Sequence, residues 1–134
     1  MKQVNEQSKL ILDVLFEKYV NNGGHIKINN SDVFIPLVVE ILYDGTLSLC
    51  HYGELNGDLM RDPEVIFVKN DKGNYYPIYF RNDYLGIESW YVEINGNDWK
   101  LHDRKGQLDL SEFCDTWLLN IKEQQNLQIE ILEK

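Results

Sequence analysis

Hydrophobic and polar residues follow one another along this chain in a pattern that predicts a helix, a series of short strands and a second helix. The N-terminal segment has apolar residues at helical spacing, on one side of a helix: Leu10, Ile11, Val14, Leu15 and Tyr19. Asn5 is a suitable N-cap, and the Asn-Asn-Gly-Gly run at 21–24 is a stop signal. The pattern indicates an amphipathic helix that covers the core.

Turn residues between apolar runs predict a meander of β-strands. The expected elements are one short strand and three hairpins: 25–28, then 37–43 with 46–52, 65–69 with 75–80, and 87–94 with 97–102. Pro77 cannot donate a hydrogen bond to a neighbouring strand. Its strand is therefore expected at an edge of the sheet or at a bulge.

The first hairpin has the most specific turn, because Asp-Gly at 44–45 is typical of a two-residue type I′ connection. Such a turn fixes the register. It predicts Val38 opposite His51 and Val39 opposite Cys50, with Val39 and Cys50 buried. Both faces of both strands are largely apolar, which favours a place in the middle of the sheet.

Asn-Gly at 95–96 predicts the register of the last hairpin in the same way. Val92 is expected opposite Trp99, and Trp90 opposite Leu101, all on one face. The other face of this hairpin is polar. One side of the hairpin is therefore expected to cover the core.

The C-terminal helix has a clear start signal. Asp109 and Glu112 have the spacing of a capping box, and Leu108 and Phe113 that of a hydrophobic staple. The expected buried stripe follows helical spacing: Leu110, Phe113, Cys114, Trp117, Leu118 and Ile121. After this helix the pattern at 126–134 alternates, which suits either a terminal strand or a frayed tail.

These elements predict the fold class α+β: an antiparallel meander of about six strands, covered by N-terminal and C-terminal amphipathic helices. The length of 134 residues is typical of a single domain. The net charge of −9 comes from 22 acidic and 13 basic residues. Direct binding to nucleic acid requires a basic surface, so we expect none.

The two cysteines, Cys50 and Cys114, lie among apolar residues and form neither a disulfide framework nor a metal motif. They are expected to be reduced and buried. The first residues lead into an amphipathic segment without the apolar core of a signal peptide. No run approaches the ~18 apolar residues of a membrane span. The predicted location is cytoplasmic, away from membranes.

Ionisable residues gather in two predicted loops, 51–64 and 81–86, which could meet at one end of the sheet. Loops between rigid strands often carry binding residues. These loops supply the candidate binding cleft: His51, Tyr52, Glu54, Asn56, Asp58, Arg61, Asp62, Glu64, Asn82, Asp83 and Tyr84.

One interpretation of the first loop is a site for a divalent metal with five ligands: His51, Glu54, Asp58, Asp62 and Glu64. These ligand types are suitable, but their spacing matches neither an EF-hand loop nor a zincin helix. Turn chemistry explains the same residues, with a turn at 56–57 and carboxylates that accept local backbone hydrogen bonds. We therefore predict no metal site and no cofactor. The nucleophile-elbow, P-loop and dinucleotide-binding motifs are also absent from the sequence.

The same two segments carry a resemblance. The runs H-Y-G-E and N-G-D-L-M-R-D-P-E within 51–64, followed by R-N-D-Y-L-G at 81–86, resemble a bacterial domain family of unknown function. The likeness spans about residues 25–95. That family occurs on plasmids and conjugative elements and within large polyvalent proteins of mobile elements. The resemblance implies a bacterial, intracellular setting and assigns no catalytic residue.

The function predicted from these observations is a non-catalytic accessory or binding module of a bacterial mobile element. Its partner would be another protein or a small ligand. Two alternatives remain open: a metal-dependent hydrolase acting on nucleic acid or its components, and an acidic mimic of DNA that inhibits a DNA-binding enzyme.

Overall fold

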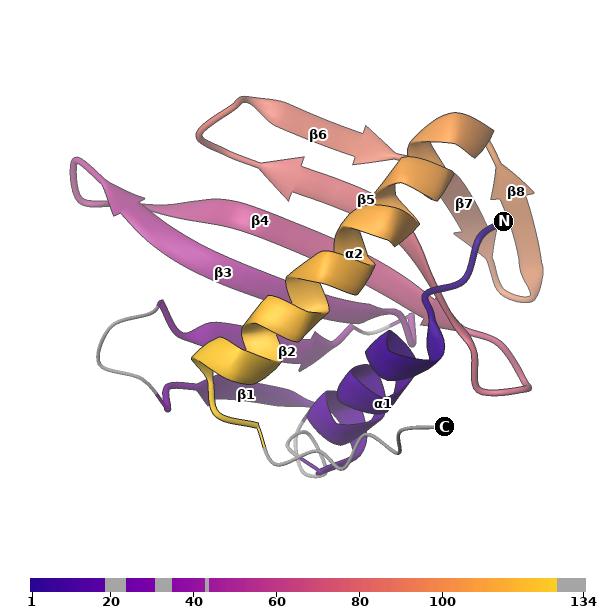
Figure 1. Cartoon of the computed structure of the whole chain (residues 1–134). Coiled ribbons are helices and arrows are strands. Elements are labelled where there is room, and N and C mark those ends of the chain that lie inside the picture. The colour runs from indigo at the N-terminus through magenta and orange to yellow at the C-terminus, as the bar shows by residue number, and fades with distance from the viewer. Residues whose placement is uncertain (19–23, 31–34, 43, 128–134) are drawn as a thin grey trace.

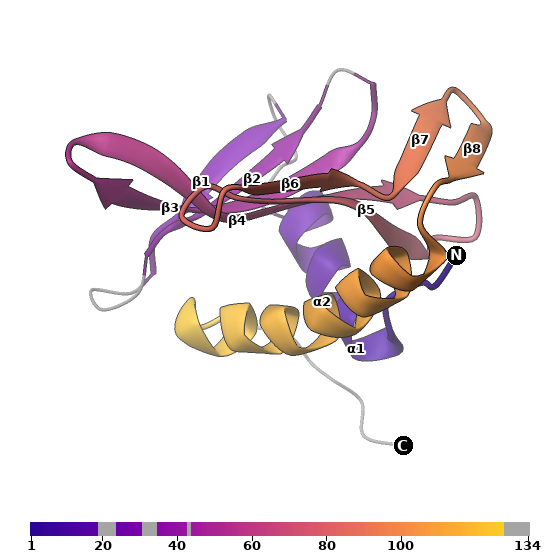
Figure 2. The same cartoon turned by 90° about the horizontal axis from the view of Figure 1, so that it is seen from above.

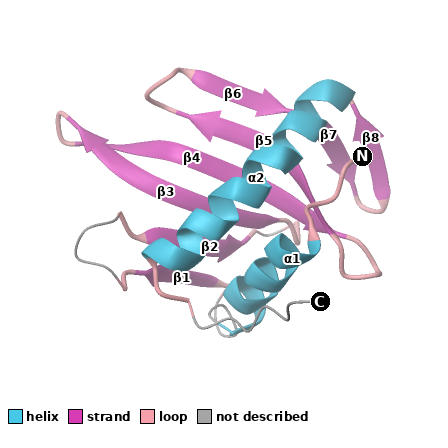
Figure 3. Ribbon diagram, viewed as in Figure 1, coloured by secondary structure: helices cyan, strands magenta, loops and turns pink. Residues whose placement is uncertain are grey.

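The computed structural model of this chain describes residues 1–18, 24–30, 35–42 and 44–127. The elements in chain order are α1 (Glu6–Asp13) with a π-helical continuation (Val14–Lys18), β1 (His25–Ile28), β2 (Leu37–Ile41), β3 (Leu47–Leu55), β4 (Asp58–Lys69), β5 (Tyr75–Asn82), β6 (Ile87–Trp90), β7 (Val92–Asn95), β8 (Asp98–Leu101) and α2 (Arg104–Gln124). Strands β1 to β6 form one antiparallel sheet in chain order, and β7 pairs with β8 in a separate hairpin (Figures 1 and 3). The predicted α+β meander with N-terminal and C-terminal helices is confirmed.

The helices and the β7–β8 hairpin lie on opposite sides of the six-stranded sheet. Both helices cover one face, and the hairpin rises from the other (Figure 2). The main core fills the space between helices and sheet, and its fully buried members include Ile11 and Leu12 of α1, Leu37 and Val39 of β2, Leu49 of β3, Phe67 of β4, and Leu118 and Ile121 of α2. Burial of apolar side chains of this kind is the dominant favourable contribution to folding.

Helix α1 begins where the sequence predicts. The side chain of Asn5 accepts a hydrogen bond from the Ser8 N–H at 2.9 Å, which satisfies one donor of the first turn. The buried stripe differs in part from the prediction, because Leu12 and Phe16 are buried whereas Leu10 is 37% exposed. Tyr19 and residues 21–23 of the predicted stop lie outside the described residues.

The predicted register of the β2–β3 hairpin is wrong by one residue. Leu37 pairs with His51, and Val38 pairs with Cys50. After a shift of one residue, each residue of β3 lies opposite a β2 residue whose side chain is on the other face from the one predicted. Val39 and Cys50 are nevertheless both buried, as predicted, and the hairpin lies inside the sheet between β1 and β4.

The connection between β2 and β3 explains this shift. The Leu42 N–H donates to the Thr46 carbonyl at 2.8 Å, and the Gly45 N–H donates to the Leu42 carbonyl at 2.9 Å. Leu42 and Thr46 therefore close a connection one residue longer than a two-residue turn, with Gly45 at φ +83°. The Asp44 carboxylate accepts from both the N–H and the hydroxyl of Thr46, a side-chain turn that competes with the type I′ geometry.

Strand β5 contains the predicted irregularity at Pro77. Ile66 of β4 pairs with Tyr79, whereas its neighbour Phe67 pairs with Pro77, so Ile78 is an extra residue on β5. The strand is thus bulged, which was one of the two arrangements predicted for the strand that contains Pro77. It is not at an edge, since β6 pairs with its other side.

The last hairpin is shorter than predicted and has its turn one residue later. Val92 pairs with Leu101 and Asn95 with Asp98, so Val92 is not opposite Trp99. Gly96 is the first central residue of the turn at φ +63°, which is typical of a type II′ connection. The register moves by two residues, which leaves the predicted apolar face unchanged.

Trp90 was expected to pair with Leu101 but belongs to β6, where it pairs with Tyr79 of β5. The chain leaves the main sheet immediately after Trp90, and the Tyr91 N–H donates to the carbonyl of Ile78 at the bulge. This contact anchors the start of β7 to the face of the sheet opposite to the helices.

Helix α2 begins earlier than predicted. Asp103 is the N-cap and accepts a hydrogen bond from the Gly106 N–H at 2.9 Å, so the predicted cap at Asp109 is wrong. Asp109 lies inside the helix and pairs with Lys105. Tertiary contacts extend the helix, because the buried Gln107 amide donates to two backbone carbonyls from other segments.

The buried stripe of α2 follows the predicted spacing except at Phe113, which is 41% exposed. Phe113 lies edge-on to Phe80 and stacks on Trp117, so it closes the margin of the core. Leu127 after the helix is buried. Residues 128–134 of the predicted terminal strand or frayed tail lie outside the described residues.

Candidate functional site

The uncovered face of the sheet is the side opposite to α1 and α2, and the β7–β8 hairpin covers one end of it (Figure 2). Under that hairpin lies a second, smaller core with five buried members: Ile66, Val68, Ile78, Tyr79 and Val92. The segments predicted to form the binding cleft lie at the other end, around the tip of β3 and β4. The face thus has an apolar end and a polar end.

The sequence suggested that segment 51–64 is a loop, but in the structure this segment is the far half of a long hairpin. Tyr52 pairs with Arg61, and Leu55 with Asp58. The turn is at Asn56 and Gly57, both at positive φ (53° and 86°), as in type I′ turns. Apart from the buried His51, the residues in this extension are partly or fully exposed. The hydrophobic alternation that identifies a strand is therefore missing here.

The polar end of the face is organised by the carboxylate of Asp83. Its Oδ2 accepts from the Arg61 N–H at 2.7 Å, and its Oδ1 accepts from Arg81 Nε at 2.8 Å. In return the Asp83 N–H donates to the Arg61 carbonyl at 2.8 Å. The backbone hydrogen bond from Arg61, with the Arg81 side chain, lowers the pKa of Asp83. Asp83 is therefore ionised and fixed in place.

Two further acids complete this group, which we call the Arg61–Arg81 cluster: Arg61, Glu64, Arg81, Asp83 and Glu88. Arg61 Nε lies 3.3 Å from Glu64 Oε1, an ion pair without the alignment of a hydrogen bond. Arg81 Nη1 lies 3.4 Å from Glu88 Oε2. Positive and negative side chains therefore alternate across β4, β5 and β6.

Neighbouring side chains on the same face hold the two outer acids. The Ser48 hydroxyl donates to Glu64 Oε2 at 2.8 Å, and the Tyr79 hydroxyl donates to Glu88. Burial, with the hydrogen bond to Glu88, raises the pKa of Tyr79 to about 12. Tyr79 is therefore a neutral donor near pH 7, and each of the two outer acids accepts a hydrogen bond from a neighbouring hydroxyl.

The turn after β5 is tied to the β3–β4 hairpin by two more contacts. Asn82 Nδ2 donates to Asp62 Oδ1 at 2.9 Å, and the Tyr84 hydroxyl donates to the Glu54 carbonyl at 3.3 Å. A side chain on Gly53 would collide with the Tyr84 hydroxyl. The close approach of Tyr84 thus explains the glycine.

These contacts bring together most of the predicted site residues from the two segments: Glu54, Arg61, Asp62, Glu64, Asn82, Asp83 and Tyr84. Tyr52 shares the uncovered face and lines a cavity of about 400 Å³ together with Leu59 and Val38. Asn56 and Asp58 lie exposed at the hairpin tip, away from the cluster along the strand.

His51 is separate from this group. It is 7% exposed on the helix-covered face, where its ring lies edge-on to Trp117 at 5.7 Å between centroids. Its Nε2 is buried without a hydrogen-bond partner among the described residues. Burial lowers the pKa of His51, and the charge of Asp62 opposes this shift only in part. His51 is therefore a neutral core residue.

The cluster offers groups suited to ionic and hydrogen-bonding contacts. In the described part of the chain, no three or more His, Cys, Asp or Glu side chains are placed to hold a metal ion. The one thiol near the cluster is Cys50, and burial with the charge of Glu64 raises its pKa to about 12. A thiol in that state is a poor nucleophile. The cluster instead presents fixed charges and hydrogen-bonding edges.

Sequence reasoning missed Arg81 and Glu88 as members of the cluster, and it missed the role of Trp90. Strand alternation contains the signal, because Arg81 and Tyr79 are two residues apart on β5 and so share a face. The cross-strand pairing of Arg81 with Glu88 then depends on the short turn between β5 and β6.

The fold and the cluster define a class: an α+β domain with a six-stranded antiparallel sheet, one face covered by helices and the other carrying a fixed polar group. The chain belongs to the family described as Domain of unknown function (DUF6908), whose model matches residues 7–127. That match extends beyond the segment 25–95 and includes most of both helices. Comparisons with curated proteins and with solved structures each find no match. Neither described helix has both the length and the apolar character needed to cross a membrane.

Proposed function

We propose that this protein is a non-catalytic binding domain that recognises a protein partner through the polar end of the uncovered sheet face. The observation that carries this proposal is the Arg61–Arg81 cluster on three adjacent strands, beside Leu59, which is 73% exposed. Charged groups whose positions are set before binding favour specific recognition because little ordering is lost on association.

The residue types around the cluster suit a protein partner. Tyrosine and arginine are enriched at interface centres, and this face offers Tyr52 and two arginines around the apolar Leu59. The side chains of Arg61 and Arg81 are each 35% exposed, so their outer edges remain accessible. The alternation of charge sign across the cluster interrupts any continuous acidic stripe there, which weighs against mimicry of DNA.

We further propose that the domain acts in the cytoplasm of a bacterium, as an accessory module of a mobile element. This setting is supported by the resemblance in segments 51–64 and 81–86. It is tested by the identity of neighbouring genes: plasmid, conjugation or phage functions beside family members would support the setting, and a uniform chromosomal context would oppose it.

Photo-crosslinking in the host cell tests the binding surface. A photoreactive amino acid replaces Leu59 in one protein and Leu10 of α1 in a control, since both leucines are exposed but only Leu59 lies on the uncovered face. We expect a discrete adduct with one cellular protein from position 59 alone. Equal labelling from both positions, or discrete labelling from position 10 alone, would refute the proposal.

A further inference from the structure

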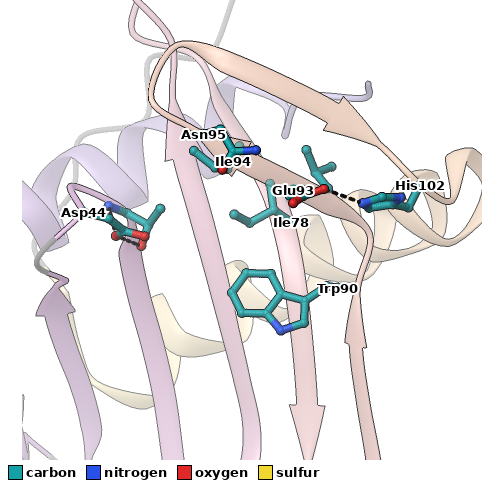
Figure 4. Close-up of a pocket in the computed structure, with 9 residues that line it drawn as sticks. Asp44, Ile78, Trp90, Glu93, Ile94, Asn95 and His102 are labelled. Atoms are coloured by element: carbon teal, nitrogen blue, oxygen red, sulfur yellow. Dashed lines mark hydrogen bonds and ion pairs between the residues drawn. The ribbon is translucent and has the colours of Figure 1, made fainter.

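A second cavity lies on the uncovered face at the end opposite to the Arg61–Arg81 cluster, beside the β7–β8 hairpin. It has a volume of about 400 Å³, within the range of about 300–1,000 Å³ usual for small-molecule sites. Residues from three hairpins line it (Figure 4): Asp44 and Thr46 from the β2–β3 connection, Ile78 from β5, Trp90 from β6, Val92, Glu93, Ile94 and Asn95 from β7, and His102 after β8.

The floor of the cavity is apolar and rigid. Ile78 and Val92 are fully buried, and the Tyr91 N–H bond to the Ile78 carbonyl fixes the two strands to each other. The bulge at Ile78 adds an apolar side chain to this face of β5. Ile94 lines the cavity above these buried side chains and is partly exposed, so an apolar group that enters the cavity would meet Ile94 on a packed floor.

Trp90 forms one wall and is the most exposed of the three tryptophans, at 55%. Its ring lies 4.4 Å from the ring of Tyr79 between centroids, and that contact holds it beside the cavity. In Figure 4 the Trp90 ring stands below Ile78, on the opposite side from Asn95. An exposed indole held in place offers a face to a cation as well as to an apolar group.

The rim of the cavity is acidic. Asp44 lies at one side and Glu93 at the other, where Glu93 Oε2 is 3.3 Å from Nε2 of His102 (Figure 4). The described lining residues include no lysine or arginine. Hydrogen bonds from Thr46 fix the Asp44 carboxylate at this rim. The cavity thus combines an apolar floor, an aromatic wall and a negative entrance.

We propose that this cavity binds a small organic cation with an apolar body, such as an arylalkylamine. The apolar body would pack on the partly exposed Ile94, and the ammonium group would lie at the face of Trp90, within the negative field of the rim carboxylates of Asp44 and Glu93. Such a group gains both charge attraction and a cation–π contact. This binding is independent of the protein partner proposed for the Arg61–Arg81 cluster.

The test uses phenethylamine, with 2-phenylethanol as its neutral match and 3-phenylpropionate as its anionic counterpart. Each is titrated into the full chain at low salt, and binding is followed by backbone amide shifts in NMR spectra and by tryptophan fluorescence. We expect shifts at β6, β7 and the β2–β3 connection, with the amine binding several-fold more tightly than the alcohol and the acid binding least. Equal affinities for all three, or shifts elsewhere, would overturn the proposal.

Single substitutions measure separately how much the rim charge and the aromatic wall contribute to the affinity. Asp44→Asn keeps an oxygen to accept the Thr46 bonds, and it should weaken the amine about threefold while leaving the alcohol unchanged, as expected for one partly exposed charge. Trp90→Leu should weaken the amine more than the alcohol. Asp58→Asn, at the far hairpin tip, is the matched control and should change neither. Loss of amine affinity in the control equal to that in Asp44→Asn would contradict the site.

Titration with a peptide distinguishes binding of a free small amine from binding of a lysine side chain of a partner protein. The blocked tripeptide Ala-Lys-Ala supplies the same ammonium group without an aromatic body. We expect it to bind more weakly than phenethylamine. Tighter binding of the tripeptide would overturn the assignment to a free small molecule.

Discussion

Removal of the Asp103 side chain tests how α2 begins, and the sequence and the structure predict different results. In the structure Asp103 Oδ1 accepts a hydrogen bond from the Gly106 N–H at 2.9 Å. The sequence pattern instead placed the cap at Asp109, which lies within the helix and contacts Lys105 Nζ at 3.1 Å. The variants Asp103→Ala and Asp109→Ala therefore form a matched pair.

The expected magnitudes follow from these contacts. Loss of an aspartate N-cap costs about 1 kcal/mol, within a range of about 0.5–2, and the favourable interaction of the carboxylate with the helix dipole adds about 0.3–1 kcal/mol at low salt. Asp109 and Lys105 have side chains that are 58% and 85% exposed, and such i,i+4 pairs contribute only about 0.3–0.5 kcal/mol. Asp103→Ala should thus be clearly the more destabilising change.

Urea unfolding followed by circular dichroism measures the difference. With a slope of about 2 kcal/mol per M, a loss of about 1 kcal/mol lowers the midpoint by about 0.5 M. The midpoint of Asp109→Ala should move by less than half as much. Asp103→Asn keeps an acceptor for the Gly106 N–H and should retain most of the stability. A larger shift for Asp109→Ala than for Asp103→Ala would show that the reasoning about the cap is wrong.

Three further predictions concern single sites. The folded state lowers the pKa of His51, so the unfolded chain binds a proton at His51 more readily than the folded protein does. The free energy of unfolding should therefore fall as the pH drops below the unfolded pKa of about 6.5. His51→Leu should reduce this pH dependence in urea unfolding measured between pH 5 and 7.5. Cys50 and Cys114 are buried with raised pKa values, so a thiol reagent should label neither in the folded protein and both in urea; rapid labelling of the native protein would contradict their burial. Gly53→Ala should displace the Tyr84 hydroxyl and destabilise by about 1 kcal/mol, whereas Gly53→Ala combined with Tyr84→Phe should recover part of the loss, as a double-mutant cycle would show.

Much of the fold follows from the sequence because periodicity and turn residues are local signals. The apolar stripes of α2 and the strand order of the meander depend on residues that are close in sequence. The register of β2 and β3 failed because the Asp44 side chain bonds to Thr46 and favours a longer connection. The start of α2 failed because Gln107 is held by contacts with Lys2 and Pro77, which lie far away in sequence.

The site was predictable only in its polar half. The residues of 54–64 and 82–84 can be recognised in the sequence because they have ionisable or polar side chains. The structure brings several of them together around Asp83. His51 lies apart from them, because its polar ring faces Trp117 on the helix-covered side. The cavity at Trp90 has no local signature, since Asp44, Ile78 and His102 come from three different hairpins and meet only through the tertiary fold.

The most direct test of the proposed function is the affinity of the crosslinked partner for three proteins: the wild type, Leu59→Glu and Leu10→Glu. Both variants place a carboxylate at an exposed leucine, so neither should disturb folding, and amide spectra check this. Calorimetry should find that Leu59→Glu weakens binding at least about tenfold, as expected for an interface hot spot, while Leu10→Glu binds like the wild type. Equal affinities of Leu59→Glu and the wild type would contradict a binding surface on the uncovered face of the sheet.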